Sequence, residues 1–228
     1  MFLTPELKLQ DGFQCLETLT HEGACSQGAR FLSHLGPVEA TFYAPGVVRL
    51  RFLPQDRRGY GMLVMSPQDV DVARFELPNG YGLQAGETSF ELHNNPLCVS
   101  LKYRGQTILQ SATDCDIQGN LRWMPFAKRE GEWMVSLNLS SESSVFGLGE
   151  KFGPLSRKGQ LIDSWNQDAL TVNAERSYKN VPFAWSHDGW GLFVHTTSRV
   201  IHGVGYPQWS HRNYILKVPD SELDLFFI

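Results

Sequence analysis

The feature that most restricts the fold of this chain is the density of glycine and proline, which divide it into short apolar pieces. The 228 residues include 21 glycines and 12 prolines. Between these breaks, apolar side chains mostly recur at every second position. In Val48–Phe52 the three apolar residues fall on one face and two arginines on the other, and Trp133–Leu139 repeats the pattern. Because side chains alternate between the two faces of a β-strand, both segments are predicted to be strands.

Further segments extend this pattern along the chain. Leu97–Tyr103 alternates and then turns at Arg104-Gly105 into Thr107–Leu109, which predicts a hairpin. Gly191–His195 and Val218–Ile228 are also predicted strands. No apolar run with helical spacing exceeds about two turns, and the internal repeats of a propeller are missing. We therefore predict an all-β fold, a single antiparallel β-sandwich domain over residues 1–228 with few or no helices.

Size and charge exclude several classes of protein. The 20 basic and 24 acidic side chains leave a net charge of −4 with no concentrated basic region, so no nucleic-acid partner is expected. No apolar run approaches the roughly 18 residues that a membrane helix needs. The segment Met1–Glu6 lacks the blocks of a secretion signal, so we expect a cytoplasmic protein without membrane segments. The chain is also too short for a (β/α)₈ barrel of about 250 residues.

The cysteines and histidines lack the spacing of a metal or redox site. Cys15, Cys25, Cys98 and Cys115 are widely separated, so we expect four reduced and mostly buried thiols. A Cys15–Cys25 disulfide is sterically possible, but nothing in the sequence requires it. The seven histidines include no His-x-x-x-His spacing. We predict neither a metal nor a cofactor.

Two segments depart from the strand pattern. Residues 151–176 are long and polar, with Trp165 and Asn166-Gln167-Asp168 near their middle. Loops of this length are uncommon in compact domains and are often functional. Leu223–Ile228 is strongly apolar and has no polar tail, although chain ends are normally exposed. We therefore expect the protein to continue beyond Ile228 and to cover this apolar surface; a buried final strand is the alternative.

Five short motifs follow one another over residues 145–228. They are Val145–Phe152 (VFGLGEKF), Trp165–Asp168 (WNQD), Tyr178–Phe183 (YKNVPF), Gly189–Val194 (GWGLFV) and Leu223–Ile228 (LDLFFI). This ordered series resembles the N-terminal β-sandwich of glycoside hydrolase family 31, the α-glucosidases and α-xylosidases. The bacterial α-xylosidase-like members look most similar. Residues 1–144 agree with the family in strand pattern and in little else.

The resemblance implies a galactose-mutarotase-like supersandwich that is followed by a catalytic (β/α)₈ barrel. In that family the nucleophile and the general acid of the retaining mechanism are both barrel aspartates. This chain has no counterpart of the family's Trp-x-Asp-Met-Asn motif, so we expect no catalytic residue here and no activity from the chain alone. The implied partners are the downstream barrel and an α-linked oligosaccharide or glycoside. The choice between glucoside and xyloside, and a homo-oligomer, are left open.

The resemblance also assigns residues to the substrate. In the family, a sandwich loop reaches over the barrel mouth, and the aspartate of its Trp-Asn-Arg-Asp motif bonds substrate hydroxyls; the matching residue is Asp168. A carboxylate suits this role because it accepts hydrogen bonds from two neighbouring hydroxyls. Asn166 and Gln167 complete the substrate-binding segment, although Gln167 replaces the family arginine and removes a cation. Trp165 and Tyr178 are expected to support the loop.

Other groups of residues have weaker claims to function. The glycines of Gly147–Gly153 have the wrong spacing for a phosphate-binding loop. A glycosidase needs two carboxylates about 5 to 10 Å apart. Two sets of acidic residues are close enough in sequence to suggest such a pair, and we predict that both are solvated turn residues: Asp114 with Asp116, and Asp220 with Glu222 and Asp224.

Two alternative functions remain. An aldose mutarotase of this fold uses a His and Glu pair, a role open to His195 or His202 with Glu175, although we expect both histidines to be satisfied within a sheet. A stand-alone carbohydrate-binding module would present aromatic residues along an exposed groove. Of the six tryptophans, we expect at least four to pack in the core or a domain interface. Trp123–Phe126 and Tyr206–Trp209 are loop-like and are candidates for exposure.

Overall fold

The computed structural model describes residues 9–55, 60–169 and 176–228. Within these ranges the chain forms nineteen strands and no complete helix. The described part of the chain therefore contains no helix that could cross a membrane. Neighbouring strands in the sheets pair antiparallel throughout. The predicted all-β antiparallel fold is confirmed.

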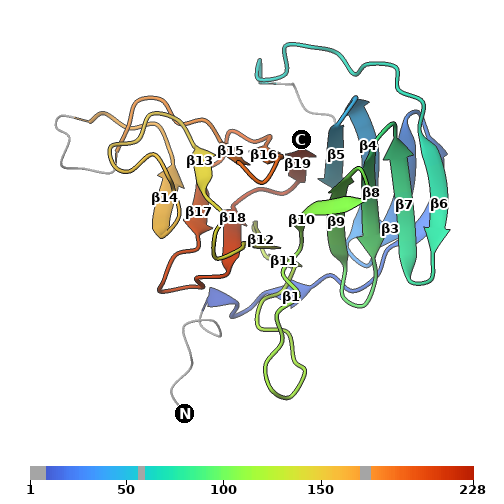
Figure 1. Cartoon of the computed structure of the whole chain (residues 1–228), viewed down its shortest axis with the longest axis horizontal. Helices are drawn as coiled ribbons and strands as arrows, with labels where there is room; N and C mark the ends of the chain where they lie inside the picture. The colour runs from blue at the N-terminus through green and yellow to red at the C-terminus, as the bar shows by residue number, and fades with distance from the viewer. Residues whose placement is uncertain (1–8, 56–59, 170–175) are drawn as a thin grey trace.

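The strands form three sheets (Figure 1). Sheet A has the order β1 (Gln14–Cys15), β11 (Phe126–Arg129), β12 (Glu132–Asn138), β18 (Asn213–Val218), β17 (Val200–Val204) and β14 (Gln160–Ser164). Sheet B has the order β13 (Val145–Gly147), β15 (Phe183–Ser186), β16 (Trp190–Val194), β19 (Leu223–Phe227), β5 (Val47–Phe52), β4 (Gly36–Ala44), β3 (Gly28–Ser33) and β2 (Thr20–Cys25). Sheet C has the order β10 (Gln106–Gln110), β9 (Cys98–Tyr103), β8 (Thr88–His93), β7 (Gly80–Ala85) and β6 (Ala73–Leu77).

Sheet B is one layer of the sandwich, and sheets A and C make the other. Sheets A and C are joined just after β10, where Ser111 bridges to Leu137 and the Ala112 amide donates to the Ser136 carbonyl at 2.8 Å. The Phe52 ring of sheet B lies 5.3 Å from the Phe126 ring of sheet A. A single apolar core accordingly draws side chains from all three sheets.

The alternation seen in the sequence sets which face of each strand is buried. In β5 the side chains of Val48, Leu50 and Phe52 enter the core, as predicted. In β12 the odd positions also enter the core, but Met134 is buried as well, because a second apolar cluster covers the outer face of sheet A. The hairpin predicted over residues 97–109 is confirmed as β9 and β10.

Two predicted element boundaries are wrong. The predicted strand Val218–Ile228 is two strands, because β18 ends at Val218 and β19 begins at Leu223. The predicted loop over residues 151–176 contains β14, which pairs with β17. β14 has only two apolar residues, the adjacent Leu161 and Ile162, and therefore no alternation that would distinguish a strand from a loop.

The apolar end of the chain is a central strand. β19 lies between β16 and β5 in the middle of sheet B (Figure 1), and its five residues are buried. The prediction that Phe226 and Phe227 form a surface awaiting cover is therefore wrong, and the buried-strand alternative is correct for Leu223–Phe227. Trp123 and Phe126 are also buried rather than exposed.

The four cysteines are free thiols, as predicted, but they are less buried than expected. Cys115 is exposed, and Cys15, Cys25 and Cys98 are half-buried. Burial, followed by the negative charge of Glu17, raises the pKa of Cys15 to about 12 and that of Cys98 to about 11. Both thiols are therefore poor nucleophiles near neutral pH.

Candidate functional site

The predicted substrate-binding segment begins where β14 ends. β14 is the edge strand of sheet A, so Trp165–Ala169 leave the sandwich at its rim (Figure 1). Trp165, Asn166 and Asp168 are exposed, and Gln167 is half-buried. The Asp168 carboxylate has no hydrogen-bond or ion-pair partner among the described residues, which leaves its oxygens available to an external donor.

The base of this segment is clamped by Asn180. The backbone N–H of Asn180 donates to Asn166 Oδ1 at 2.8 Å, and its side-chain Nδ2 donates to the Trp165 carbonyl at 2.9 Å. A parallel bridge joins Asn166 to Ser177, and the Gln167 N–H donates to the Ser177 carbonyl at 3.0 Å. The two ends of the segment are thus held together, and Asn166 acts as an acceptor within the protein.

Tyr178 crosses the same base. Its hydroxyl donates to the Ala169 carbonyl at 2.9 Å, although its ring is largely exposed. This contact ties residue 169, the last one described before the gap, to the returning chain. Tyr178 therefore lies where a loop-supporting residue is expected.

A glycine turn after β13 supports the returning chain. Gly147 and Gly149 have φ angles of +96° and +83°, which side chains rarely adopt. A Cβ on Gly149 would lie 2.3 Å from the Lys179 carbonyl oxygen, and one on Gly147 would lie 2.4 Å from that of Phe183. The glycines of the VFGLGEKF motif are thus required because residues 179–183 pack directly on this turn.

Arg157 holds the glycine turn from the other side. This buried guanidinium donates from Nε to the Gly147 carbonyl at 3.0 Å and from Nη1 to the Pro154 carbonyl at 3.0 Å. Sequence reasoning did not identify Arg157 or Asn180 as structural residues. Asn180 lies within a quoted motif, whereas no sequence signal distinguishes Arg157 from other surface-type arginines.

A hollow of about 310 Å³ opens beside the clamp. Its lining includes Trp165, Asn166, Asn180 and Thr196–Ser198. The Trp165 indole is 44% exposed, so it forms an accessible wall of the hollow rather than packing under the loop. The structure thus brings Trp165 and Asn166 together at one hollow, whereas Gln167 and Asp168 are not part of its described lining.

An exposed charged pair lies beside the glycine turn. Lys179 Nζ lies 3.3 Å from Glu150 Oε1, and both side chains are mostly exposed. Such exposed pairs contribute little stability. This pair is therefore a surface feature and adds no buried charge to the site.

The prediction of solvated turn carboxylates is wrong for Glu222 and Asp224. Glu222 and Asp224 are buried ion-pair partners of Arg51 and Arg49, at 2.6 Å each. Burial alone would raise the pKa of Asp224, but hydrogen bonds from Arg49 and His195 outweigh it and lower the pKa. Asp114 is partly covered and pairs with Arg212 at 3.5 Å, whereas Asp116 caps its own exposed turn through the amides of Gln118 and Asn120.

His195, one residue after β16, and His202, in β17, each have a structural partner, but the prediction that both are satisfied is wrong for His202, because its buried Nε2 has no hydrogen-bond partner among the described residues. His195 Nδ1 lies 2.8 Å from Asp224 Oδ2, and His202 Nδ1 lies 2.7 Å from the Tyr214 hydroxyl. Burial lowers the pKa of His202 to about 3, so its imidazole is neutral near pH 7. Glu175, the other half of the suggested mutarotase pair, lies outside the described residues. Within the described ranges no group of three or more His, Cys, Asp or Glu side chains is arranged to hold a metal.

Comparison with known proteins identifies the fold and its relatives. The model of the glycosyl hydrolase 31 N-terminal galactose mutarotase-like domain matches residues 37–201. An α-xylosidase of Emericella nidulans is 36% identical over 103 residues, which are 45% of this chain and 13% of that protein. The α-xylosidase XylQ of Lactiplantibacillus pentosus is 41% identical over 69 residues, or 30% of this chain and 9% of that protein.

Solved structures show the same fold at low sequence identity. A family 31 dextranase of Flavobacterium johnsoniae, solved with glucose, superposes with a TM-score of 0.75 at 19% identity over 94% of this chain and 26% of its own. A family 31 α-xylosidase from a soil metagenome, solved with xylose, has a TM-score of 0.68 at 13% identity over 92% of this chain and 32% of its own. The chain thus spans only a small part of the relatives that it matches.

Proposed function

The chain belongs to the family of glycosyl hydrolase 31 N-terminal galactose mutarotase-like domains, and on this basis we propose that it serves a longer retaining α-glycosidase. The family match over residues 37–201 carries this proposal. The proposed substrates of the whole enzyme are terminal α-linked glucosyl or xylosyl residues, since two curated relatives are α-xylosidases. The reaction would use two aspartates of a (β/α)₈ barrel downstream of this domain.

The proposed role of the sandwich is to support the barrel and to position a substrate contact. A site of this kind needs its side chains held within about half an ångström by rigid surroundings. The Asn180 clamp, the Tyr178 bond and the glycine turn provide such a base for the segment that carries Asp168. The unpaired Asp168 carboxylate would accept hydrogen bonds from two sugar hydroxyls, and Asn166 and Gln167 would complete the contact.

Gln167 distinguishes this chain from the family motif. Its backbone N–H is bound to Ser177, so its position is fixed by the clamp, while its amide side chain is neutral. Where the family has an arginine, no positive charge is supplied next to Asp168. The proposed carboxylate contact would therefore act without a neighbouring guanidinium from this motif.

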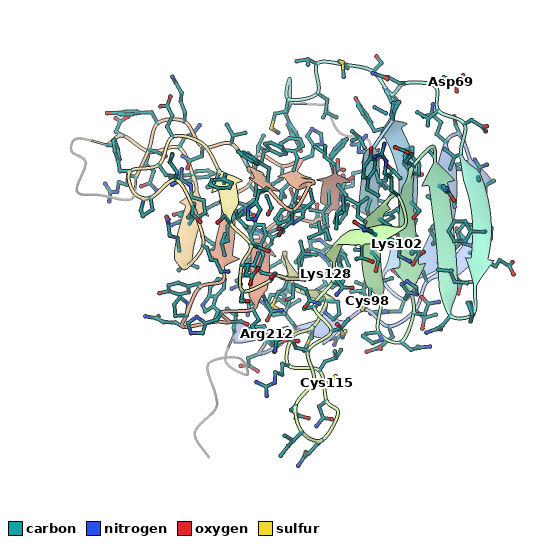
Figure 2. The ribbon with its side chains drawn as sticks, viewed as in Figure 1. Asp69, Cys98, Lys102, Cys115, Lys128 and Arg212 are labelled. Carbon is teal, nitrogen blue, oxygen red and sulfur yellow. The ribbon has the colours of Figure 1, made fainter. Side chains whose placement is uncertain are left out.

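The test is substitution of Asp168 in the intact enzyme. Asp168→Ala should lower kcat/KM for p-nitrophenyl α-xyloside or α-glucoside. The corresponding activation free energy should rise by about 1–3 kcal/mol, as for loss of a hydrogen bond to a charged group. Asp69→Ala is the matched control, because Asp69 is exposed and lies away from β14 (Figure 2). Unchanged kinetics of Asp168→Ala would contradict the assignment.

A carbohydrate-binding module is the second candidate, and the exposed Trp165 indole at the 310 Å³ hollow favours it. Calorimetric titration of the chain with maltose, xylose and isoprimeverose separates the two functions. Binding that is lost in Trp165→Ala would favour the module, whereas wild-type binding in that variant would not.

A further inference from the structure

A second hollow lies on the outer face of sheet A, away from the Trp165 segment. It has a volume of about 330 Å³ and opens between a projecting loop, residues 113–122, and the turn between β17 and β18. Figure 2 shows Arg212 and Cys115, two of its residues, on the lower side of the molecule, whereas the C-terminus lies near the top in Figure 1. Pockets for small ligands begin at roughly this volume.

The floor of this hollow carries an unsatisfied polar group. Asn213 is only 1% exposed, and its Oδ1 accepts a hydrogen bond from Ser210 Oγ at 2.5 Å. Its buried Nδ2 has no partner among the described residues. A buried donor without an acceptor is rare and destabilising in proteins. Asn213 Nδ2 is also shielded from solvent, so this side chain forms a fixed part of the floor and is not itself a ligand contact.

One wall of the hollow is the indole of Trp209. The Trp209 ring lies directly on the backbone of Gly203, where an added Cβ would lie 2.3 Å from a ring carbon. The Tyr206 ring meets it edge-on at 6.0 Å, and Trp123 packs beneath it in the outer apolar cluster. The half-buried indole is thus held in one orientation before any ligand arrives, which reduces the entropy lost on binding.

The rim carries both donors and an acceptor. Arg122 and Arg212 are exposed guanidinium groups, and Asp114 also belongs to the lining. Arg212 Nη2 is 3.5 Å from Asp114 Oδ1, a loose pair that a ligand could bridge. A sugar hydroxyl both donates and accepts, so it matches a rim of this composition. The carboxylate of Asp114 offsets the charge of the nearby Arg212 guanidinium.

We propose that this hollow binds one neutral pyranose unit of an oligosaccharide. The sugar face lies against Trp209, and two hydroxyls bond Arg212 and Asp114. The inference rests on the proposed function for the class of ligand alone. The site itself is separate from Trp165, Asn166 and Asp168, and would hold a remote part of the substrate or a neighbouring glycan chain.

The experiment titrates the 228-residue chain with maltotriose, observed by calorimetry and by NMR of the tryptophan indole N–H signals. The Trp209 signal is identified with Trp209→Phe. Arg212→Ala and Asp114→Ala change exposed or rim side chains and should each weaken binding about tenfold. Arg104→Ala is the matched control, because Arg104 is an exposed arginine that pairs with Glu87 in sheet C. This control and Trp165→Ala should bind maltotriose as the wild type does.

Four results would overturn the proposal, and the first three concern maltotriose. These are the absence of maltotriose binding at millimolar concentrations, binding that is unaffected by both rim variants, and binding that is lost in Trp165→Ala alone. Tighter binding of glucuronate than of maltotriose would also overturn it, since the ligand would then be an anion. The proposed function is tested separately, by turnover of Asp168→Ala. A failure of the sugar-binding hollow therefore does not contradict the Asp168 contact, and the reverse is also true.

Discussion

On the outer face of sheet B, two arginines lie beside two buried carboxylates. Arg49 and Arg51 alternate with the core residues of β5, and β19 pairs with β5 so that Asp224 lies opposite Arg51. Arg49 donates to both Asp224 oxygens, at 2.9 and 2.6 Å, and Arg51 donates to Glu222. Such bidentate bonds compensate for the cost of burying the charges. The sequence shows the acidic residues next to a turn, but their partners lie about 170 residues away along the chain.

Removal of one member of this network should be costly. Asp224→Ala leaves Arg49 and His195 without their shared acceptor inside a nearly closed site, so the free energy of unfolding should fall by about 3 kcal/mol. Urea denaturation at pH 7 measures this change. Asp69→Ala removes an exposed carboxylate and should change stability by less than about 0.5 kcal/mol. Equal stability of the two variants would show that the network contributes nothing.

His202 should make the protein sensitive to acid. Its pKa of about 3 in the folded chain is below the value of about 6.5 in the unfolded chain, so the unfolded state binds more protons between these limits. Stability should therefore be complete above pH 6.5 and fall by about 1 kcal/mol per pH unit as the pH decreases toward 3. Denaturation midpoints at pH 7, 6 and 5 test this slope.

Two variants identify the source of this pH dependence. His202→Gln removes the titrating group and should flatten the slope between pH 6.5 and 4, even if the variant is less stable at pH 7. His34→Gln changes an exposed histidine and should retain the wild-type slope. The assignment to His202 is wrong if both variants keep the same pH dependence.

At the scale of elements, local patterns were sufficient where a strand has one solvated face and insufficient elsewhere. β5 and β9 alternate cleanly, because one side of each faces the core. β19 is buried on both faces, so its largely apolar sequence does not show where it begins or which strands it joins. Likewise, the clamp around Asn180 depends on residues 165–167 and 177–180 meeting, which no local pattern reveals.

The glycine turn after β13 gives a prediction that separates two effects of a side chain. Gly149→Ala combines an unfavourable φ of +83° with a Cβ that would lie 2.3 Å from the Lys179 carbonyl oxygen. Gly131→Ala has a similar φ of +70° but no atom within 4 Å. We expect Gly131→Ala to cost about 1 kcal/mol and Gly149→Ala at least about 2 kcal/mol more, because the backbone must move.

Thermal denaturation of the two glycine variants measures this difference. In addition, trypsin should cleave the Gly149→Ala variant faster after Lys179, which is held against the turn by the Glu150 N–H bond to its carbonyl. Gly131→Ala should show the wild-type cleavage rate at Lys179. If both substitutions cost the same, the close approach to residues 179–183 does not constrain the turn.

For the molecule as a whole, the fold could be predicted from the sequence and the candidate site only in outline. Short alternating segments between glycines and prolines indicated the sandwich, and the ordered motifs indicated the family. The motifs also contain Trp165, Asn166 and Asn180, which the structure brings together. The hollow below Arg212 could not be anticipated, because the 113–122 loop and the turn before β18 meet only through the arrangement of sheet A.

The order of strands in sheet B predicts that β19 holds the molecule together. β13, β15 and β16 lie on one side of it and β5, β4, β3 and β2 on the other, so its removal would divide the sheet. It also contributes Leu223, Leu225 and Phe227 to the shared core. A chain ending after Glu222 should therefore lack a cooperative unfolding transition, because both new edges and the core face would be open to water.

A peptide of residues 221–228 tests whether this loss is due to the missing strand. Added to the shortened chain, it should restore the β-sheet circular dichroism signal and a cooperative transition, since it can pair with β16 and β5 and fill the core. The same peptide with Leu225→Asp has the matching backbone but places a charge in the core, so it should fail. A shortened chain that unfolds cooperatively without peptide would show instead that the two parts of sheet B are stable apart.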